Sequence, residues 1–501
     1  MKRPLGPFSV CFIRSALCLG LLACNSHAKR ILLLPTALDA SHIFTQLKVF
    51  EELRCRDHGH TVKMVIAEAD VPSLSKGTHA GCIEFTTYAT PGLKQQMANL
   101  VQGEHLPRYT EHARRVQRIW GSACDALLSD EAAMSWVQEF SPDLVVGISV
   151  YICTSMLSAK LGVPYVTVTP GGLMSDEWQP WYASAWNFYI PLRLSYSLDQ
   201  LGRYAPPKSF LDRLRHTLSA LNIQIDDYLH TRPYLRSLQR KHGLDMTSKP
   251  VRELELMHLV GGDLAIEQPR PLPPKVKLIG PLMPAPAQPL PAELEDFISG
   301  AGKEGVILVS LGNHAMFGKR EITALSGCFA RLPQRVIWKM RPPEQSESEE
   351  HKALNLTSNI RVMPWVPQND ILGHESTKAF LSHMGANGLY EAAYHGVPVV
   401  AVPFFADQHV NSLKAVIKGF GVILERMTMS EEAALTAFDK VLKESQYIES
   451  ARRVSRQLHL PRARTPLQEA GDWIERAMEM DGVSYLRTPE EELSWAIKKN
   501  A

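Results

Sequence analysis

The sequence predicts an α/β protein built from two doubly wound, parallel-sheet domains that face each other across a cleft. Its 501 residues exceed what one compact core usually holds, so two domains are expected. Short apolar strands alternate with helical stretches in each half of the chain, which is typical of βαβ units with parallel strands. Residues 268–291 contain nine prolines and separate the halves as a stiff, extended connector.

The strands and helices follow from runs of apolar residues. The predicted strands of the first half are 31–35, 61–67, 143–150 and 165–169. The helices that connect them are predicted at 44–56 and 153–161. The second half repeats the alternation, with strands predicted at 306–310, 336–338, 360–362, 379–381 and 399–403.

These elements divide the chain into five segments. They are a signal peptide (1–28), an N-terminal domain (29–267), a Pro-rich linker (268–291), a C-terminal domain (292–468) and a helical tail without a transmembrane span (469–501). The chain is 45% hydrophobic and 21% charged, with a net charge of +2. This composition is that of a folded globular protein and offers no electrostatic footprint for nucleic acid.

The N-terminus has the form of a cleaved secretory signal. Lys2 and Arg3 precede a short apolar run at 15–24, and Ser26-His27-Ala28 has the small-x-small form of a cleavage site. An uncleaved anchor and a cytosolic extension are the alternatives. The signal predicts a protein of the endoplasmic reticulum lumen or a secreted protein, and it makes Asn355-Leu356-Thr357 a glycosylation site.

Five cysteines follow the predicted signal, and their spacing does not suggest a metal or redox site. They are Cys55, Cys82, Cys124, Cys153 and Cys328. No pair has the CxxC spacing of zinc or redox motifs. One or two disulfides, or free buried thiols, are both compatible with this pattern.

Polar residues gather after the predicted strand 379–381, at the edge of a parallel sheet where ligands commonly bind. A helix begins there, and its free N–H groups favour an anion such as a diphosphate. His383 and Asn387 can donate to phosphate oxygens from the same turn. Glu391 lies one helical turn after Asn387, so its carboxylate can accept ribose hydroxyls on the same face.

Two further pairs extend this candidate site. Asp407 and Gln408 end the next strand and have the acceptor and donor groups to bind vicinal sugar hydroxyls. Trp365 offers an aromatic plate beside Gln368, whose amide suits a pyrimidine edge. Each of these residues alone is typical of core packing, but their order along the chain favours a nucleotide-sugar site.

The motifs resemble those of the animal UDP-glycosyltransferases, which include the glucuronosyltransferases and the ceramide galactosyltransferases. The resemblance is carried by 363–411 (MPWVPQND…SHMGANGLYEAAYHG…PFFADQHVN), by Ser310-Leu311-Gly312, by Gly280-Pro281 and by Asp39-Ala40-Ser41-His42. It implies a GT-B fold and inverting transfer of a hexose from a UDP-sugar to a lipophilic small molecule or lipid. It implies no metal and no cofactor, since the UDP-sugar is a co-substrate.

The resemblance also implies residue roles. His42 matches the family's general base, which takes the proton of the acceptor hydroxyl. The donor-binding positions are Ser310, Gly312, Trp365, Gln368, His383, Gly385, Asn387, Glu391, Asp407 and Gln408. The N-terminal domain would bind the acceptor and the C-terminal domain the UDP-sugar.

Three positions depart from the family pattern. The family usually has a carboxylate that orients the histidine, and here Ile148 stands in its place, which leaves Ser149 or a backbone carbonyl to hold the ring. The common His-Gly-Gly is His383-Met384-Gly385, which places a bulky side chain beside the diphosphate turn. The common Ser-Leu-Gly-Ser ends in Asn313.

These departures leave two readings of the function open. One is an active glycosyltransferase that uses UDP-glucuronate or UDP-glucose. The other is a catalytically weak relative that binds a UDP-sugar or a lipophilic ligand. The aromatic segment 178–196 suits a lipophilic acceptor pocket or peripheral contact with a membrane, with plain core packing as the alternative.

Overall fold

The computed structural model describes residues 28–56, 58–74, 83–102, 109–172, 225–246, 254–269, 272–312, 315–340 and 357–479, together with 210, 211, 214, 218, 222 and 486. Several positions singled out from the sequence lie outside these residues. They are the predicted signal peptide up to residue 27, the aromatic segment 178–196, Cys82, Asn313, Asn355 and the end of the chain from residue 487. Among the described residues, no helix combines the length and the apolar character needed to cross a membrane.

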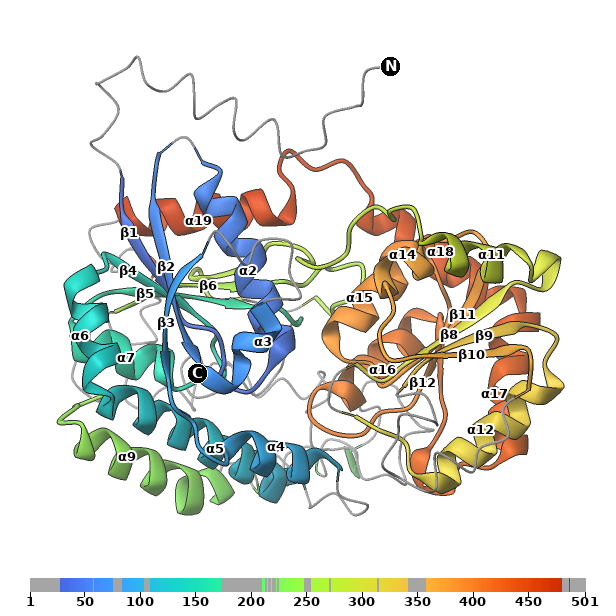
Figure 1. Ribbon diagram of the computed structural model, residues 1–501, viewed down its shortest axis with the longest axis horizontal. Helices are drawn as coiled ribbons and strands as arrows, with labels where there is room; N and C mark the ends of the chain where they lie inside the picture. The colour runs from blue at the N-terminus through green and yellow to red at the C-terminus, as the bar shows by residue number, and fades with distance from the viewer. Residues whose placement is uncertain are drawn as a thin grey trace.

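Two parallel sheets form the centres of the two domains (Figure 1). In spatial order, the N-terminal sheet consists of β3 (Glu84–Tyr88), β2 (Thr61–Ala67), β1 (Arg30–Leu33), β4 (Leu144–Gly147), β5 (Tyr165–Thr169), β6 (Glu255–Val260) and β7 (Val276–Leu278). The C-terminal sheet consists of β10 (Ile360–Met363), β9 (Arg335–Lys339), β8 (Val306–Ser310), β11 (Thr377–Ser382), β12 (Val399–Ala401) and β13 (Gly421–Ile423). All paired strands are parallel, which confirms the predicted fold class.

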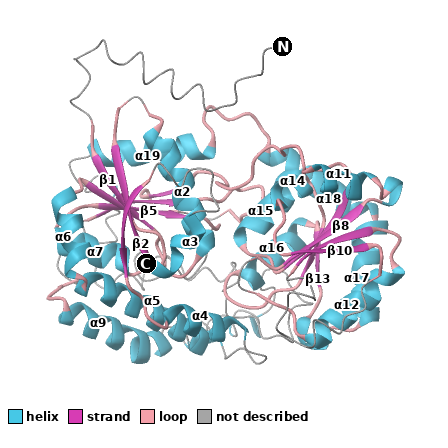
Figure 2. Ribbon diagram, in the orientation of Figure 1, coloured by secondary structure: helices cyan, strands magenta, loops and turns pink. Residues whose placement is uncertain are grey.

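Helices cover both faces of the N-terminal sheet (Figure 2). One face carries α2 (Ala40–Arg54), α3 (Val71–Leu74) and α19 (Pro466–Glu479). The other carries α4 (Leu93–Gln102), α5 (Tyr109–Ser129), α6 (Glu131–Phe140), α7 (Cys153–Leu161) and α9 (Arg232–Lys241). Ile31 and Leu33 pack in one core, and Leu32 and Leu34 pack in the other, because successive side chains of a strand point to opposite faces. Burial on both faces explains the unbroken apolar run in β1.

The C-terminal sheet is covered in the same way. One face packs against α11 (Ala292–Ser299), α14 (Gln368–Leu372), α15 (Ala386–His395), α16 (Gln408–Lys418) and α18 (Ser445–Leu458). The other packs against α12 (Lys319–Arg331) and α17 (Glu431–Lys443). The helices α14, α15 and α16 matter most for function, because each begins at the carboxyl edge of the sheet, where β10, β11 and β12 end.

The Pro-rich segment differs from the simple connector expected from its composition. Its residues 276–278 form β7, which pairs with β6 in the N-terminal sheet. The strand lies at the edge of that sheet. Since proline has no backbone N–H, the prolines around an edge strand interrupt no hydrogen bonds between central strands. The remaining residues up to Pro291 lead to α11 of the second domain.

The last described helix, α19, returns from the C-terminal domain to pack on the N-terminal one (Figure 1). Arg56, beside the end of α2, donates to Asp472 at 2.7 Å and to Glu475 at 2.6 Å. His60 lies 3.0 Å from the second oxygen of Glu475. The two domains are therefore connected twice by the chain, once before α11 and once before α19.

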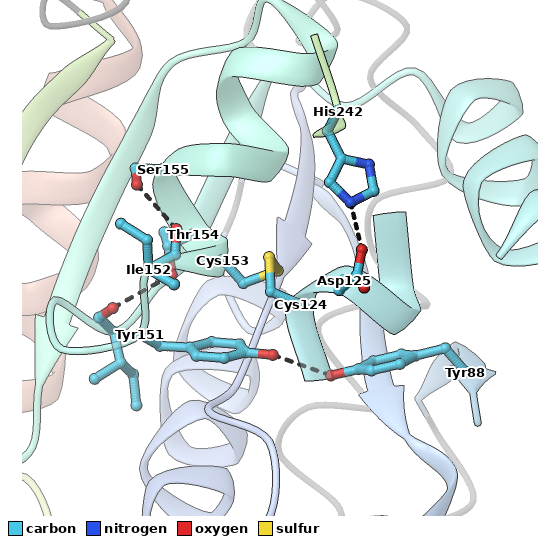
Figure 3. The surroundings of a disulfide bond; sticks show 10 residues. Tyr88, Cys124, Asp125, Tyr151, Ile152, Cys153, Thr154, Ser155 and His242 are labelled. Carbon is cyan, nitrogen blue, oxygen red and sulfur yellow. Dashed lines mark hydrogen bonds and ion pairs between the residues drawn. A yellow bond between two sulfur atoms is a disulfide. The ribbon is translucent and has the colours of Figure 1, made fainter. Parts of the chain in front are cut away.

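A disulfide joins Cys124 of α5 to Cys153 at the start of α7, which resolves the open question about these two thiols (Figure 3). Both residues are fully buried. Beside them the hydroxyls of Tyr88 and Tyr151 lie 3.2 Å apart. Since Tyr151 belongs to the loop that follows β4, the bridge lies next to this loop. Cys328 is a free, buried thiol, and Cys55 is exposed and lies outside this bridge.

We predict that removing this disulfide lowers the stability of the N-terminal domain. The bridge closes a loop with a sequence separation of 29 residues, and the chain-entropy model assigns such a loop about 3–4 kcal/mol. Cys124→Ala combined with Cys153→Ala should therefore lower the denaturation midpoint, and a reductant should affect the wild type but not the double variant. Cys55→Ala, at an exposed cysteine outside this bridge, is the control and should change neither value. An unchanged midpoint in the double variant would contradict the prediction.

Candidate active site

The turn between β11 and α15 is built around the His383 ring. A Cβ added at Gly312 would lie 2.8 Å from this ring, and one added at Gly385 would lie 2.7 Å from its Nε2. Such contacts are too short for carbon, so both positions need glycine. Gly385 also precedes the first residue of α15. The ring is thus held beside the free N–H groups of a helix start, which is a suitable place for an anion.

The Met384 side chain does not lie where the sequence led us to expect it. It is fully buried in the core of the C-terminal domain instead of filling the diphosphate turn. Its backbone has a φ of +64°, a left-handed conformation that disfavours side chains. The hydroxyl of Ser382 accepts the Met384 N–H at 3.0 Å, and Asn411 donates to its carbonyl at 3.1 Å. These contacts and the apolar packing hold the strained turn in place.

The groups expected to bind the base and ribose also meet. Gln368, the first residue of α14, donates to a carboxylate oxygen of Glu391 at 2.5 Å. Burial raises the pKa of Glu391 to about 7, although the hydrogen bond from Gln368 acts in the opposite direction. Trp365 is 61% exposed three residues before Gln368. Trp365 therefore presents an exposed aromatic face close in sequence to Gln368, whose amide contacts the Glu391 carboxylate.

The residues predicted to bind the sugar, Asp407 and Gln408, are held by hydrogen bonds that connect them to the same turn. The side-chain oxygen of Gln408 accepts the N–H groups of Phe404 and Phe405, at 2.8 and 3.1 Å, which leaves its NH₂ group to contact a ligand. Asp407 accepts a hydrogen bond from Asn411 at 2.7 Å. Since Asn411 also bonds to Met384, this residue links the sugar side to the diphosphate turn.

The remaining donor-site positions lie at the ends of neighbouring elements. Ser310 ends β8 with its side chain buried, and Asn387 lies in the first turn of α15. Lys339 ends the adjacent strand β9 and donates to the Gly312 carbonyl at 3.0 Å. Sequence reasoning missed Lys339 and Asn411, although the place of Lys339 at the end of an apolar strand was a usable signal.

His42 lies in the first turn of α2, on the N-terminal domain. Its Nδ1 is 3.4 Å from a carboxylate oxygen of Asp39, the residue that caps this helix. Ile148 is fully buried at the end of β4. Ser149, which the sequence left as a partner for His42, shares a hydrogen bond of 2.8 Å with Thr169 instead.

Contacts between the domains surround these residues. A Cβ at Gly171, in the loop after β5, would lie 3.3 Å from that of Ala386 in α15. The His112 ring of α5 stacks on Phe405 with centroids 5.4 Å apart. The N-terminal domain therefore reaches both the diphosphate turn and the loop that carries Asp407.

Among the described residues, the group with suitable spacing for a metal ion is His58, His60 and Glu475, far in sequence from the turn around His383. His60 accepts the Lys29 N–H through Nδ1 at 3.1 Å, so its neutral ring carries the proton on Nε2. That nitrogen then donates to Glu475, which Arg56 also contacts. A hydrogen-bonded ion-pair network accounts for this cluster without a metal ion.

We predict that UDP affinity depends on the protonation of Glu391. A carboxylate accepts two ribose hydroxyls better than the neutral acid does, so affinity should fall as the pH drops through about 7, by up to tenfold per unit. Calorimetry of UDP binding measures this slope. Glu391→Gln is the control, because glutamine does not ionise. In this variant, only the pH dependence of affinity that comes from the phosphates of UDP should remain. Identical slopes in both proteins would contradict the prediction.

We predict that two substitutions in the turn affect different properties, one the stability of the protein and the other its affinity for UDP. Met384→Gly relieves about 1–2 kcal/mol of backbone strain but removes a buried side chain worth about 2–5 kcal/mol, so stability should fall while UDP affinity stays unchanged. Gly385→Ala should weaken UDP binding, because its Cβ would displace the His383 ring. Denaturation curves and calorimetry separate the two effects. Tighter UDP binding by Met384→Gly without a loss of stability would show that the Met384 side chain fills the turn.

The chain is similar to known proteins over almost its whole length. The model of the family "UDP-glucoronosyl and UDP-glucosyl transferase" matches residues 29–498. A UDP-glucuronosyltransferase 2A1 of Rattus norvegicus is 30% identical over 91% of this chain and 86% of its own length. A 2-hydroxyacylsphingosine 1-beta-galactosyltransferase of Mus musculus is 28% identical over 94% of this chain and 84% of its own length.

Solved structures agree with the fold. The glycotransferase of kitacinnamycin superposes with a TM-score of 0.62 and 20% identity, over 90% of this chain and 99% of that one. A UDP-glucose: anthocyanidin 3-O-glucosyltransferase in complex with UDP gives a TM-score of 0.61 at 15% identity, over 90% and 98% of the two chains. These similarities confirm the GT-B fold, and the family match shows that the chain belongs to the UDP-glucoronosyl and UDP-glucosyl transferase family.

Proposed function

We propose that the chain transfers a hexose, glucuronic acid or glucose, from its UDP derivative to a hydroxyl group of a lipophilic small molecule or lipid. The observation that carries this proposal is the His383 ring, held by two glycines beside the start of α15. Around it lie acceptor and donor groups suited to each part of a UDP-sugar. The family and its relatives support the same activity.

The donor would lie along the carboxyl edge of the C-terminal sheet. Its uracil would stack on the exposed Trp365, and its ribose hydroxyls would donate to Glu391. The diphosphate would accept hydrogen bonds from His383, Asn387 and the first N–H groups of α15. Since these N–H donors can neutralise the negative charge, the binding we propose requires no metal ion.

The acceptor hydroxyl would lie between His42 and the sugar. As its oxygen forms the new bond to the anomeric carbon, His42 takes up the hydroxyl proton. The bond between that carbon and the UDP oxygen breaks on the opposite side, and UDP leaves as an anion. A single displacement inverts the anomeric centre, so an α-linked donor yields a β-glycoside.

The disulfide supports an oxidising compartment for the N-terminal domain. Such bonds persist in the lumen of the endoplasmic reticulum and outside the cell but are rare in the cytosol. Cys124 and Cys153 are bridged inside a buried core rather than at an exposed redox site. We therefore retain the endoplasmic reticulum lumen, or secretion, as the proposed location.

The activity is tested by incubating the purified protein with UDP-sugars and phenolic, steroid and sphingoid alcohols. UDP release and the mass of the product should identify at least one pair of substrates. His42→Ala should abolish transfer but leave UDP binding unchanged, because the ring lies on the other domain. His383→Ala should weaken UDP binding by about tenfold or more, as expected when a charge-assisted donor is lost.

The outcomes separate the two readings of the sequence. Transfer that depends on His42 supports the enzyme. Normal UDP binding without product from any pair would instead support a binding protein, and an absence of UDP binding in the wild type would contradict the proposed donor site itself.

A further inference from the structure

The proposed base has no carboxylate at position 148, where the family usually supplies one. When a histidine takes up a proton, an acid on its other ring nitrogen fixes the tautomer and stabilises the cation. Here the strand β4 offers the fully buried Ile148, and the neighbouring Ser149 bonds to Thr169. The inference below rests on the proposed role of His42.

Asp39 is the carboxylate that the structure places beside this ring. Its Oδ2 lies 3.4 Å from Nδ1 of His42, three residues along the chain. That nitrogen is buried, and among the described residues it has no hydrogen-bond partner at an ordinary hydrogen-bond distance. Both side chains are mostly buried, with exposures of 21% for Asp39 and 18% for His42, so water screens the pair only in part.

The position of Asp39 is fixed from two sides. As the N-cap of α2 it accepts the Ser41 N–H at 3.0 Å through Oδ1. On the preceding residue, Leu38, the backbone has a left-handed φ of +66°, and its N–H donates to the buried Asp70 at 2.6 Å. The loop therefore holds the Asp39 carboxylate against the helix, with Oδ2 towards His42.

Few other charges act at this loop. Asp70 is buried on the segment after β2 and accepts the Leu38 N–H. Tyr88 and Tyr151 pack nearby, and burial raises the pKa of both hydroxyls, so both stay neutral near physiological pH. Of the two carboxylates, Asp70 bonds to the Leu38 N–H and Asp39 is the one that contacts His42.

We propose that Asp39 is the positioning residue of His42 and replaces the acid that Ile148 cannot provide. Its carboxylate accepts the Nδ1–H of the ring, which leaves Nε2 to take the acceptor proton. The Nδ1 proton stays on the ring throughout, and the negative charge stabilises the imidazolium formed in the transition state. A closure of about 0.5 Å brings the pair within charge-assisted hydrogen-bond range, and catalytic hydrogen bonds commonly tighten when substrate binds.

Asp39→Asn separates this role from helix capping, because asparagine caps a helix about as well as aspartate does. The variant should keep the folding midpoint, the UDP affinity and the KM for the donor. Its kcat should fall by about tenfold or more. Since a carboxylate beside the ring favours its protonated form, the loss of that carboxylate should also move the acidic limb of the kcat/KM profile to lower pH.

The matched control is Asp130→Asn, the same change at the N-cap of α6, where Asp130 accepts the Ala133 N–H at 2.9 Å. It should alter neither kcat nor the pH profile. If Asp39→Asn keeps the wild-type kcat and the acidic limb of the kcat/KM profile does not move, the inference is overturned. Transfer that depends on His42 would still support the proposed function in that case.

A measurement without turnover covers the case of an inactive wild type. The His42 ring signal, assigned in NMR spectra by comparison with His42→Ala, should titrate at lower pH in Asp39→Asn than in the wild type. Equal titration midpoints would overturn the inference, whatever the activity of the protein.

Discussion

The buried carboxylate of Glu267 holds the two domains in the arrangement that the site requires. It is fully buried after β6 and accepts hydrogen bonds from Tyr390 of α15 and Lys414 of α16, both at 2.8 Å. Removing one partner of a buried ion pair costs about 3–5 kcal/mol, because the remaining charge is left without compensation. The contact also excludes side chains at Gly172, where a Cβ would lie 1.7 Å from the Glu267 carboxylate. Since α15 and α16 carry Asn387, Glu391 and Gln408 of the proposed donor site, this interaction sets their place relative to the N-terminal domain.

The chemistry then follows from the edges of two parallel sheets. In each domain the strands end in loops and helix starts that present polar groups, and the fold brings these edges close together. The C-terminal edge offers N–H donors and a buried Glu391 to a nucleotide. The N-terminal edge offers His42, with Asp39 beside it. One domain can therefore hold an activated sugar while the other holds the base. A single displacement needs both, since the base takes up the proton of the hydroxyl that attacks the sugar.

Sequence reasoning predicted most of the fold, and it singled out polar groups that the structure gathers at one edge of the C-terminal sheet, because these signals are local. Apolar runs such as Ile31–Leu34 mark strands buried on both faces, and the polar residues that follow β11 and β12 mark the binding edge. Long-range contacts left no such signal. The pair Arg56 and Glu475, separated by 419 residues, ties α19 to the N-terminal domain, and nothing near either residue indicates it. The burial of Met384 depends on a left-handed backbone that the sequence alone does not reveal. The sequence does not single out the Asp39 contact, because the family pattern places its acid at position 148 and because an aspartate at the start of a helix is typical of an N-cap.

We propose that a UDP-sugar binds at the start of α15 with its anomeric carbon towards His42. A crystal structure of the full chain with UDP bound would show whether the nucleotide lies there. We expect the diphosphate to lie against His383 and the first N–H groups of α15, the ribose on Glu391 and the uracil on Trp365. UDP bound elsewhere, or bound in reverse with its base at the α15 turn and its diphosphate away from His383, would rule out the proposed donor site.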